Sequence, residues 1–151
     1  DRLEMLKLAA GTLGEVSDYE MKKEGKSYTV ETLEYLKSVY PNDDFFLYMG
    51  SDMLLEFETC WKRTEDIMKM CSIVALSRTG DDIEKLKAYA EHLKKDYCAK
   101  ADVYGYEPFV VSSSQVRGMI SAGEDVSALV PKAVCDYIKE KGLYRGGVKN
   151  G

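Results

Sequence analysis

The sequence predicts an α/β fold in which a parallel sheet carries helices on both faces. Continuous apolar runs at residues 44–50 and 72–76 are typical of strands that are buried on both sides. Amphipathic segments alternate with these runs, which is the order of elements in parallel α/β sheets. Because ligands of such sheets bind beyond the carboxyl ends of the strands, the loops that follow the strands are the first places to look for a functional site.

The first part of the chain predicts a helix, a short strand and a second helix. Residues 1–10 place apolar side chains along one side of a helix, and Gly11 ends it. Residues 15–21 alternate between polar and apolar side chains, which suits a short strand. Residues 29–39 have apolar side chains at helical spacing, with Thr29 as the expected cap.

The middle of the chain predicts two strands and the helices that follow them. The strand at residues 44–50 ends in a glycine, and a helix begins directly after it. Residues 64–71 predict a short helix with Thr64 as its cap and two acidic side chains in its first turn, where the helix dipole favours them. After the strand at residues 72–76, residues 81–95 predict a long amphipathic helix.

The last part of the chain predicts a third strand and two helices. Residues 107–111 read as a buried strand, and residues 113–123 as the helix that follows it. Residues 131–144 predict a final helix with Pro131 in its first turn and Gly142 past its end. These elements complete the alternation of strands and helices.

Composition and charge exclude several classes of protein. Apolar residues make up 45% and charged residues 31% of the 151 residues, which is usual for a globular domain with a full core. The net charge is −5 and no stretch is strongly basic, which argues against nonspecific binding of nucleic acid. No apolar run is long enough to cross a bilayer. An anionic ligand must therefore be held by a few local donors.

The four cysteines are scattered along the sequence without a CxxC pair. This pattern favours reduced, mostly packed thiols in a cytoplasmic protein. It leaves open a zinc site, although ligand pairs are absent. The cysteines are Cys60, Cys71, Cys98 and Cys135.

The only histidine, His92, is expected to lie on the surface. It falls about 130° from the centre of the apolar stripe on its predicted helix, counted at 3.6 residues per turn. Its neighbours Lys94 and Lys95 are charged. Because a catalytic base must reach a cleft, this position argues against a Ser/His/Asp triad within the chain.

Three serines and an arginine follow the predicted third strand. Ser112, Ser113 and Ser114 lie at a helix N-terminus, where backbone N–H groups have no helical acceptor. One serine can cap the helix, and the other hydroxyls with the free amides form a place for an anion. Arg117 can fold back toward the same turn, and its planar fork suits a phosphate. The alternative is a serine-rich cap beside a surface arginine.

Two further junctions carry residues that suit a nucleotide ligand. Gly50 allows a close backbone approach or a positive φ, and Asp52 is either a helix cap or an acceptor for sugar hydroxyls. Tyr28, beside Thr29, is either a stacking platform for a flat ring or a packing residue. Trp61, the only tryptophan, is expected in a loop between short helices, with a place in the core as the alternative.

These motifs resemble one known family. The segment "VSSSQVR" is similar to the ISSTxIR motif of the nucleotidyltransferase superfamily, with Ser114 in place of the threonine. The order of several further segments resembles bacterial nicotinate-nucleotide adenylyltransferase, over nearly the whole length of the chain. These segments are "SDYE", "SYTVETLEYLK", "MGSDML", the tryptophan followed by "KRTEDI", and "PKAVCDYIKEKGLY".

The resemblance implies a Rossmann-like nucleotidyltransferase fold and a defined reaction. The family transfers AMP from ATP to nicotinate mononucleotide with Mg²⁺, giving deamido-NAD and pyrophosphate. An enzyme of this kind is expected to be cytoplasmic and to bind neither nucleic acid nor membranes. The resemblance leaves open whether it forms a homo-oligomer. The residues that match catalytic positions of the family are Ser114 and Arg117, and those that match substrate-binding positions are Tyr28, Thr29, Gly50, Asp52, Trp61, Arg78 and Ser113.

One part of the family pattern is absent from this sequence. The family begins with a glycine-rich strand end and an HxGH motif, and neither is found here. Since the chain starts at Asp1, within a predicted helix, we expect this first strand–helix unit to lie upstream. Residues 1–144 would then be the C-terminal portion of the domain, and residues 145–151 a flexible tail. The strands that remain should show unpaired edges and apolar faces.

Three alternatives stay open at this point. The chain could belong to a sister adenylyltransferase that acts on nicotinamide mononucleotide or phosphopantetheine. It could bind nucleotides without catalysis, because the histidines of the family motif are absent. It could also be a structural or partner-binding α/β domain, in which the serines are caps and Trp61 is core.

Overall fold

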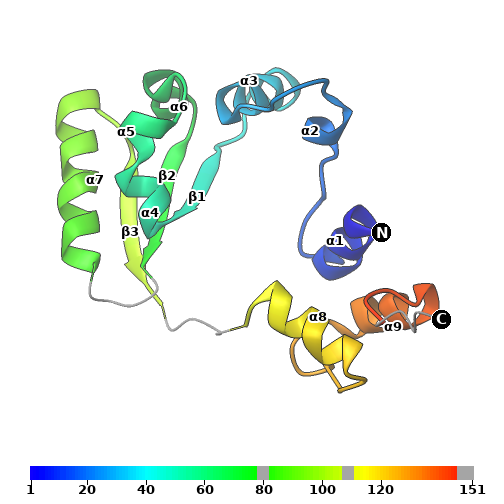
Figure 1. Ribbon diagram of the computed structural model, residues 1–151. Helices are drawn as coiled ribbons and strands as arrows, with labels where there is room; N and C mark the ends of the chain where they lie inside the picture. Colours follow the sequence, from blue (N-terminus) through cyan, green and yellow to red (C-terminus); the bar gives the residue numbers. More distant parts are fainter. Residues whose placement is uncertain (78–81, 107–110, 146–151) are drawn as a thin grey trace. The chain divides into compact units, whose positions relative to one another are not determined.

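The computed structural model describes residues 1–77, 82–106 and 111–145 (Figure 1). The chain forms two compact units. The sheet unit is Tyr19–Pro108, and the helical unit combines Asp1–Asp18 with Phe109–Gly151. In the described part of the chain, no helix has the length and apolar character that crossing a bilayer requires.

The sheet unit contains a parallel sheet, which confirms the predicted fold class. Met49, Ala75 and Val103 are neighbours across the sheet, in the register of its strands. Both of the strands that were predicted as continuous apolar runs are present, and they pair directly. The described strands, in spatial order, are β1 (Phe46–Gly50), β2 (Ser72–Ser77) and β3 (Ala101–Gly105).

Helices of the sheet unit pack against one face of the sheet. α4 contacts β1 and β2, α7 contacts β3 and β2, and the two helices contact each other (Figure 1). Helices α3 and α6 form a further pair. The helices of this unit are α2 (Tyr19–Lys22), α3 (Thr29–Val39), α4 (Ser51–Leu55), α5 (Phe57–Cys60), α6 (Thr64–Met70) and α7 (Ile83–Tyr97).

Alternation along the strands divides the sheet into a core face and an exposed face. Successive side chains of a strand point to opposite faces. One face carries Met49 and Ala75, which are buried with side chains of α3 to α7 in a single core. The other face carries three large exposed rings, those of Phe46 (60% exposed), Tyr48 (65%) and Tyr104 (56%). Among the described strands β1 lies at an edge of the sheet, so an unpaired edge and an apolar exposed face are present as expected.

The helical unit is built from α1 (Arg2–Ala10), α8 (Ser113–Ser121) and α9 (Lys132–Lys141). Helices α1 and α9 pack together, and the Tyr137 hydroxyl donates a hydrogen bond to Asp1 Oδ1 at 2.9 Å. This unit has a small core of its own. Its buried apolar side chains are Val126, Val134, Cys135 and Ile138.

The strand predicted at residues 15–21 is wrong. The structure has a short helix, α2, over Tyr19–Lys22. Tertiary contacts decide this segment: the Tyr19 ring stacks on Tyr35 of α3, with ring centres 4.0 Å apart, and Thr32 of α3 donates a hydrogen bond to Glu20. Such contacts override a weak alternation in sequence.

The sequence did not predict the third described strand. The predicted strand at residues 107–111 lies outside the described residues except for Val111, which is not in a strand. The observed third strand, β3, is Ala101–Gly105. Its exposed Asp102 and Tyr104 alternate with buried Ala101 and half-buried Val103, so it lacks the continuous apolar run that marks β1 and β2.

Helix ends confirm some predicted caps and correct others. The backbone N–H of Gln115 donates to Ser112 Oγ at 3.1 Å, so a serine caps α8 as predicted. Gly142 ends α9 with a φ of 62°, which favours glycine. The predicted caps Thr29 and Thr64 are wrong, because each is the first residue within its helix and makes no capping bond.

Candidate functional site

The sheet unit brings Tyr28, Thr29 and Trp61 together around one pocket. Tyr28 and Thr29 lie at the start of α3, and Trp61 follows the last residue of α5. The pocket is open and has a volume of about 170 Å³. Its lining is Ser27, Tyr28, Thr29, Cys60, Trp61, Lys62 and Ile67. We call this the aromatic pocket.

A lysine adds positive charge to the aromatic pocket. Lys62 Nζ lies 3.9 Å from the centre of the Tyr28 ring. The Lys62 side chain, through a hydrogen bond and its charge, holds the pKa of the Tyr28 hydroxyl below its ordinary value. The pocket therefore combines two flat rings with a cation, an arrangement that suits a flat, negatively charged ligand.

The two walls of the aromatic pocket are tied together by Arg63. Its Nη2 lies 2.7 Å from Glu34 Oε1 on α3, and its Nε lies 2.7 Å from Asp66 Oδ2 on α6. Arg63 has a φ of 54°, a left-handed conformation that non-glycine residues rarely adopt. The ion pairs fix the loop that carries Trp61 relative to the helix that follows Tyr28. They are half-exposed, so they contribute more to geometry than to stability.

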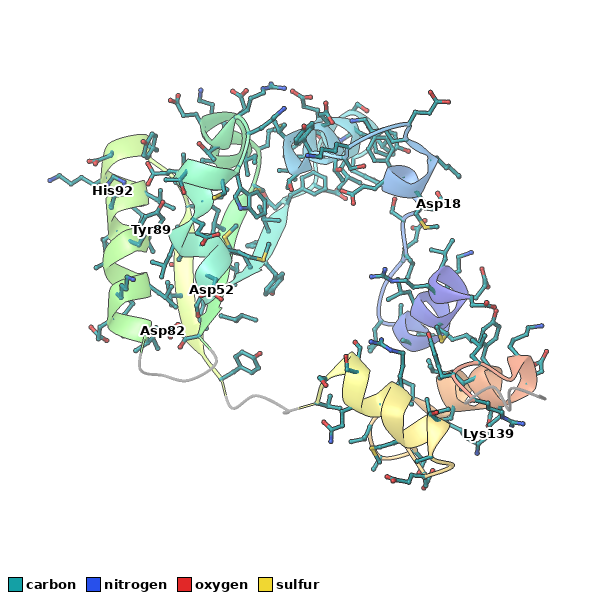
Figure 2. All side chains as sticks on the ribbon, in the orientation of Figure 1. Asp18, Asp52, Asp82, Tyr89, His92 and Lys139 are labelled. Carbon is teal, nitrogen blue, oxygen red and sulfur yellow. The ribbon has the colours of Figure 1, made fainter. Side chains whose placement is uncertain are left out.

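Gly50 and Asp52 lie at the carboxyl end of β1, as predicted. Gly50 has a φ of −79°, so of the two alternatives the positive φ does not apply. Apart from its chain neighbours, no atom of the described residues lies within 4 Å of the place where a Cβ would stand, so the backbone is open to a close approach there. Asp52 is exposed and does not cap α4 (Figure 2), and among the described side chains none forms a hydrogen bond with its carboxylate.

A polar network connects the ends of β1 and β2. Ser77, the last residue of β2, is fully buried and donates a hydrogen bond to Asp82 Oδ1. Hydrogen bonds from Ser51 and Ser77 hold the pKa of the Asp82 carboxyl below its ordinary value. Asp82 precedes α7, so this network fixes the start of α4 and the start of α7 at the same edge of the sheet.

The start of α8 presents hydroxyls and a guanidinium on an exposed surface. Ser112, Ser113, Ser114 and Arg117 are all exposed. Arg117 Nη2 lies 3.3 Å from Ser114 Oγ, so the guanidinium does turn back toward the first turn of the helix. Amides of that turn have no helical acceptors, which makes the turn suitable for an anion.

An open cavity of about 700 Å³ lies beside this turn within the helical unit. Arg2 of α1 lines it together with Arg117, so two guanidinium groups border one cavity. Apolar side chains of the three helices form the rest of its wall. The lining residues are Arg2, Met5, Leu6, Ala9, Val111, Ser112, Ser113, Val116, Arg117, Leu129, Val130, Pro131, Val134, Ile138 and Tyr144.

The remaining candidate residues fall outside these sites. Arg78 lies outside the described residues. His92 is partly exposed on the surface, where the sequence placed it, but it has partners there: its Nε2 lies 3.0 Å from Glu58 and its Nδ1 lies 2.8 Å from Asp96. It lies on α7 on the side of α5, to which Glu58 belongs (Figure 2).

The cysteines are free thiols, and half of them are packed as predicted. Cys71 and Cys135 are buried, whereas Cys60 and Cys98 are exposed. Burial raises the pKa of the Cys71 thiol to about 11, so it is unreactive at neutral pH. No cluster of three or more His, Cys, Asp or Glu side chains within the described ranges is arranged to hold a metal ion.

Sequence reasoning missed two residues that the structure adds. Lys62 follows the tryptophan directly, so a charge next to an aromatic residue in a short loop was the available signal. Arg2 gave no signal, because its cavity also involves residues from the opposite end of the chain.

Comparison with known proteins matches this arrangement to one family. The family model described as cytidylyltransferase-like matches residues 1–119. A protein of Clostridium tetani is 37% identical over 136 residues, which are 87% of this chain and 65% of that protein. One of Carboxydothermus hydrogenoformans is 38% identical over 146 residues, which are 95% of this chain and 72% of that protein. Both are described as "probable nicotinate-nucleotide adenylyltransferase".

A solved structure shows the same fold. It is described as Plasmodium falciparum nicotinic acid mononucleotide adenylyltransferase complexed with APC. The TM-score is 0.56 at 19% identity, over 80% of this chain and 60% of that one. The parallel sheet, the residues at its carboxyl ends and these matches lead to one assignment: the chain belongs to the cytidylyltransferase-like family and groups with its nicotinate-nucleotide adenylyltransferases.

Proposed function

We propose that the protein carrying this chain transfers AMP from ATP to nicotinate mononucleotide, giving deamido-NAD and pyrophosphate. The observation that carries the proposal is the aromatic pocket, in which Tyr28, Trp61 and the Lys62 cation surround a space for a flat anionic ring. The names of the bacterial relatives support it. The chain spans about two thirds of the length of the first of these relatives, so the proposal concerns the whole protein.

In this proposal the aromatic pocket holds the nicotinate ring. Tyr28 and Trp61 stack on it, and its carboxylate meets Lys62 and the amides at the start of α3. In the first turn of α3 the Glu31 amide donates to the Tyr28 carbonyl at 3.0 Å, so the amides of Thr29 and Val30 are the ones proposed to meet the carboxylate. The Trp61 amide is not proposed as a donor to the carboxylate, because it donates to the carbonyl of Phe57 at 3.3 Å.

The start of α8 holds the phosphates of ATP. Ser113 and Ser114 offer hydroxyls and backbone amides, and Arg117 offers its guanidinium to the β- and γ-phosphates. Arg2 on the same cavity adds a second guanidinium. In the sheet unit, Gly50 and Asp52 line the ribose, and Arg78 belongs to the nucleotide side.

The start of α8 would meet a metal ion only through the phosphates of the nucleotide. Serine hydroxyls, amides and guanidinium groups lie at this turn, and none of the described lining residues of the cavity carries a carboxylate that could bind the ion directly. Mg²⁺ prefers oxygen ligands and keeps several of its waters, so it would be held by phosphate oxygens and would neutralise their charge.

In this reaction the residues of the chain orient the two substrates and stabilise the charge that develops. An oxygen of the 5′-phosphate of nicotinate mononucleotide attacks the α-phosphorus of ATP, and the bond to pyrophosphate breaks in line with it. No covalent enzyme intermediate is needed. The protein contributes by holding the two substrates in line and by stabilising charge on the leaving pyrophosphate, which is the role proposed for Arg117 and Ser114.

Calorimetry with two variants of the intact protein tests the proposal. We expect Arg117→Ala to weaken ATP binding by about 1.5–3 kcal/mol, the range for a hydrogen bond to a charged group, and to leave nicotinate mononucleotide binding unchanged. Trp61→Ala should do the reverse. Lys132→Ala, which removes an exposed cation on α9, is the control for charge. Loss of both ligands in both variants would contradict the assignment of two separate roles.

The same protein also separates the alternatives by its products. Formation of deamido-NAD from the acid mononucleotide, with slower use of nicotinamide mononucleotide, is the expected result. Equal turnover of acid and amide would favour a sister adenylyltransferase. Binding of ATP or deamido-NAD without turnover would favour a nucleotide-binding module, and absence of any binding a structural domain.

A further inference from the structure

We propose that Glu58 is a positioning residue that holds the Trp61 wall of the aromatic pocket in place through its contacts with α7. The inference rests on the aromatic pocket as the base site of the proposed function. It concerns a group of side chains outside the lining of that pocket, none of which belongs to the sequence motifs. We call this group the Glu58 clamp: Glu58, Tyr89, His92 and Tyr97.

The Glu58 carboxylate accepts hydrogen bonds from three side chains of α7. The Tyr89 hydroxyl donates to Oε2 at 2.6 Å, and the Tyr97 hydroxyl donates to Oε1 at 2.6 Å. His92 Nε2 lies 3.0 Å from Oε2. Figure 2 labels Tyr89 and His92 on the part of α7 that lies beside α5. Both oxygens of the carboxylate are therefore used, which fixes its orientation as well as its position.

Further contacts order the α7 side of the clamp. The His92 ring is flanked edge to face by the rings of Tyr89 and Tyr97, with centres 5.7 Å and 5.9 Å away. His92 Nδ1 faces Asp96 at 2.8 Å. A long helix, α7, thus presents three preoriented donors to one carboxylate.

Helix α5 needs such a support, because it cannot be stable by itself. It has only four residues, Phe57–Cys60, and isolated helices of that length do not form in water. Phe57 fastens one side of α5 in the core, where its side chain is fully buried. Glu58 fastens the adjacent side to α7. These two neighbouring residues are the described anchors of the segment that ends at Trp61.

The position of Trp61 depends directly on this segment. Its backbone N–H donates to the Phe57 carbonyl at 3.3 Å, and its ring lies 5.4 Å from the Phe57 ring. A shift of α5 therefore moves the Trp61 ring, and with it Cys60 and Lys62 in the pocket lining. The Glu58 clamp would set the width of the space between Trp61 and Tyr28 without touching a ligand.

The test uses Trp61 as its own reporter, because it is the only tryptophan of the sequence. Glu58→Gln keeps the size of the side chain but replaces one acceptor oxygen with an NH₂ group that cannot accept a hydrogen bond. Glu56→Gln removes an exposed carboxylate two residues before Glu58 and is the matched control. Quenching of Trp61 fluorescence by acrylamide is measured first, and then the Kd of nicotinate mononucleotide and of ATP by calorimetry.

For Glu58→Gln we expect quenching to rise about twofold and the Kd of nicotinate mononucleotide to rise about tenfold, with the Kd of ATP unchanged, since a hydrogen bond to a charged group is lost. Glu56→Gln should change none of these values. Tyr97→Phe removes one donor and keeps the ring, so it should give a smaller effect of the same kind. This variant keeps the test decisive if Glu58→Gln folds poorly.

A purely structural role gives a different pattern. If Glu58→Gln and Tyr97→Phe lower the unfolding temperature but leave quenching and both Kd values unchanged, Glu58 only stabilises the fold and the inference is wrong. Failure of the unchanged protein to bind nicotinate mononucleotide would instead contradict the proposed function. The quenching experiment would still decide whether the clamp holds Trp61.

Discussion

The aromatic pocket and the start of α8 are two binding regions built in different ways. The aromatic pocket belongs to the sheet unit, and contacts from several elements hold its walls: Phe57 in the core, Glu58 on α7 and Arg63 on α3. The start of α8 is one exposed turn whose donors are capped and oriented locally, by Ser112 and Ser114. The aromatic pocket depends on contacts between several elements, whereas the start of α8 depends on the first turn of a single helix.

This difference follows from what each region is proposed to recognise. A flat ring needs two walls at a fixed separation, so residues distant in sequence must be held against each other. A phosphate chain needs amides and charge, which a helix N-terminus supplies by itself. We therefore expect changes in the core of the sheet unit to affect the ring site much more than the phosphate site.

Replacing Phe57 should have the largest effect. Phe57→Ala removes a fully buried ring beneath Trp61 and should lower the free energy of unfolding by about 3–5 kcal/mol, measured by urea denaturation. Phe46→Ala, at a ring that is 60% exposed, is the matched control and should change it by about 0.5 kcal/mol or less. At urea concentrations below the unfolding transition, Phe57→Ala should weaken the binding of nicotinate mononucleotide more than the binding of ATP. Equal losses would remove the contrast between the two regions.

Removing the cap of α8 should have the next largest effect, and only on the other region. Ser112→Ala deletes the acceptor of the Gln115 amide and should destabilise the first turn of α8 by about 0.5–2 kcal/mol. Hydrogen exchange at the Gln115 and Val116 amides measures this directly. Ser113→Ala, which leaves the cap intact, is the control. Faster exchange in both variants alike would show that the cap does not order this turn.

The sequence predicted the parts of the molecule that local patterns determine. Both continuous apolar runs are strands, and the serine cap and the glycine at the end of α9 are where they were expected. It failed where the pattern is weak: β3 is exposed on one face and alternates in polarity, and α2 is fixed by stacking on α3. The extent of one domain over residues 1–144 stays a prediction.

The candidate site was predictable residue by residue but not as a geometry. Tyr28, Thr29 and Trp61 were identified through family resemblance, and they do share one pocket. The position of the Lys62 cation over the Tyr28 ring depends on how the loop folds against α3, which no local pattern encodes. The Glu58 clamp joins a four-residue helix to three positions on a helix later in the chain. The spacing of apolar residues in the sequence therefore could not predict it.

A smaller effect should separate charge from shape in the aromatic pocket. Lys62→Gln removes the cation but keeps much of the side chain, and should reduce the preference for the acid over the amide mononucleotide by about 0.2–1 kcal/mol, the range for an exposed ion pair. The same change should raise the pKa of Tyr28, because Lys62 is the main cause of its lowering. Competition calorimetry and ultraviolet titration of the tyrosines measure the two effects. Lys69→Gln, at an exposed lysine of α6, is the control. If it changed the acid-over-amide preference and the Tyr28 pKa by the same amounts, the effects would not be specific to Lys62.

The smallest effect is expected from pH, through the Glu58 carboxyl at acid pH and the Tyr89 hydroxyl at alkaline pH. Hydrogen bonds from Tyr89, and then from Tyr97 and His92, hold the pKa of Glu58 below its ordinary 4.5. The stability that this carboxylate contributes is therefore complete above pH 4.5 and is lost as pH falls through the lowered value. Burial, and then the bond to Glu58, raises the pKa of Tyr89 from 10.0 to about 12, so its contribution is complete below pH 10 and is lost as pH rises toward 12.

Trp61 fluorescence against pH should then show a plateau with a change at each end. The charged and titratable side chains closest to the Glu58 and Tyr89 pair are His92, Asp96, Tyr97 and Glu65. In Tyr89→Phe the alkaline change should weaken while the acid change remains, because the carboxylate keeps its other donors. A wild-type profile that is flat to pH 12, or an acid change that survives unaltered in Glu58→Gln, would show that the clamp does not control the Trp61 wall and that Phe57 and Arg63 hold the aromatic pocket without it.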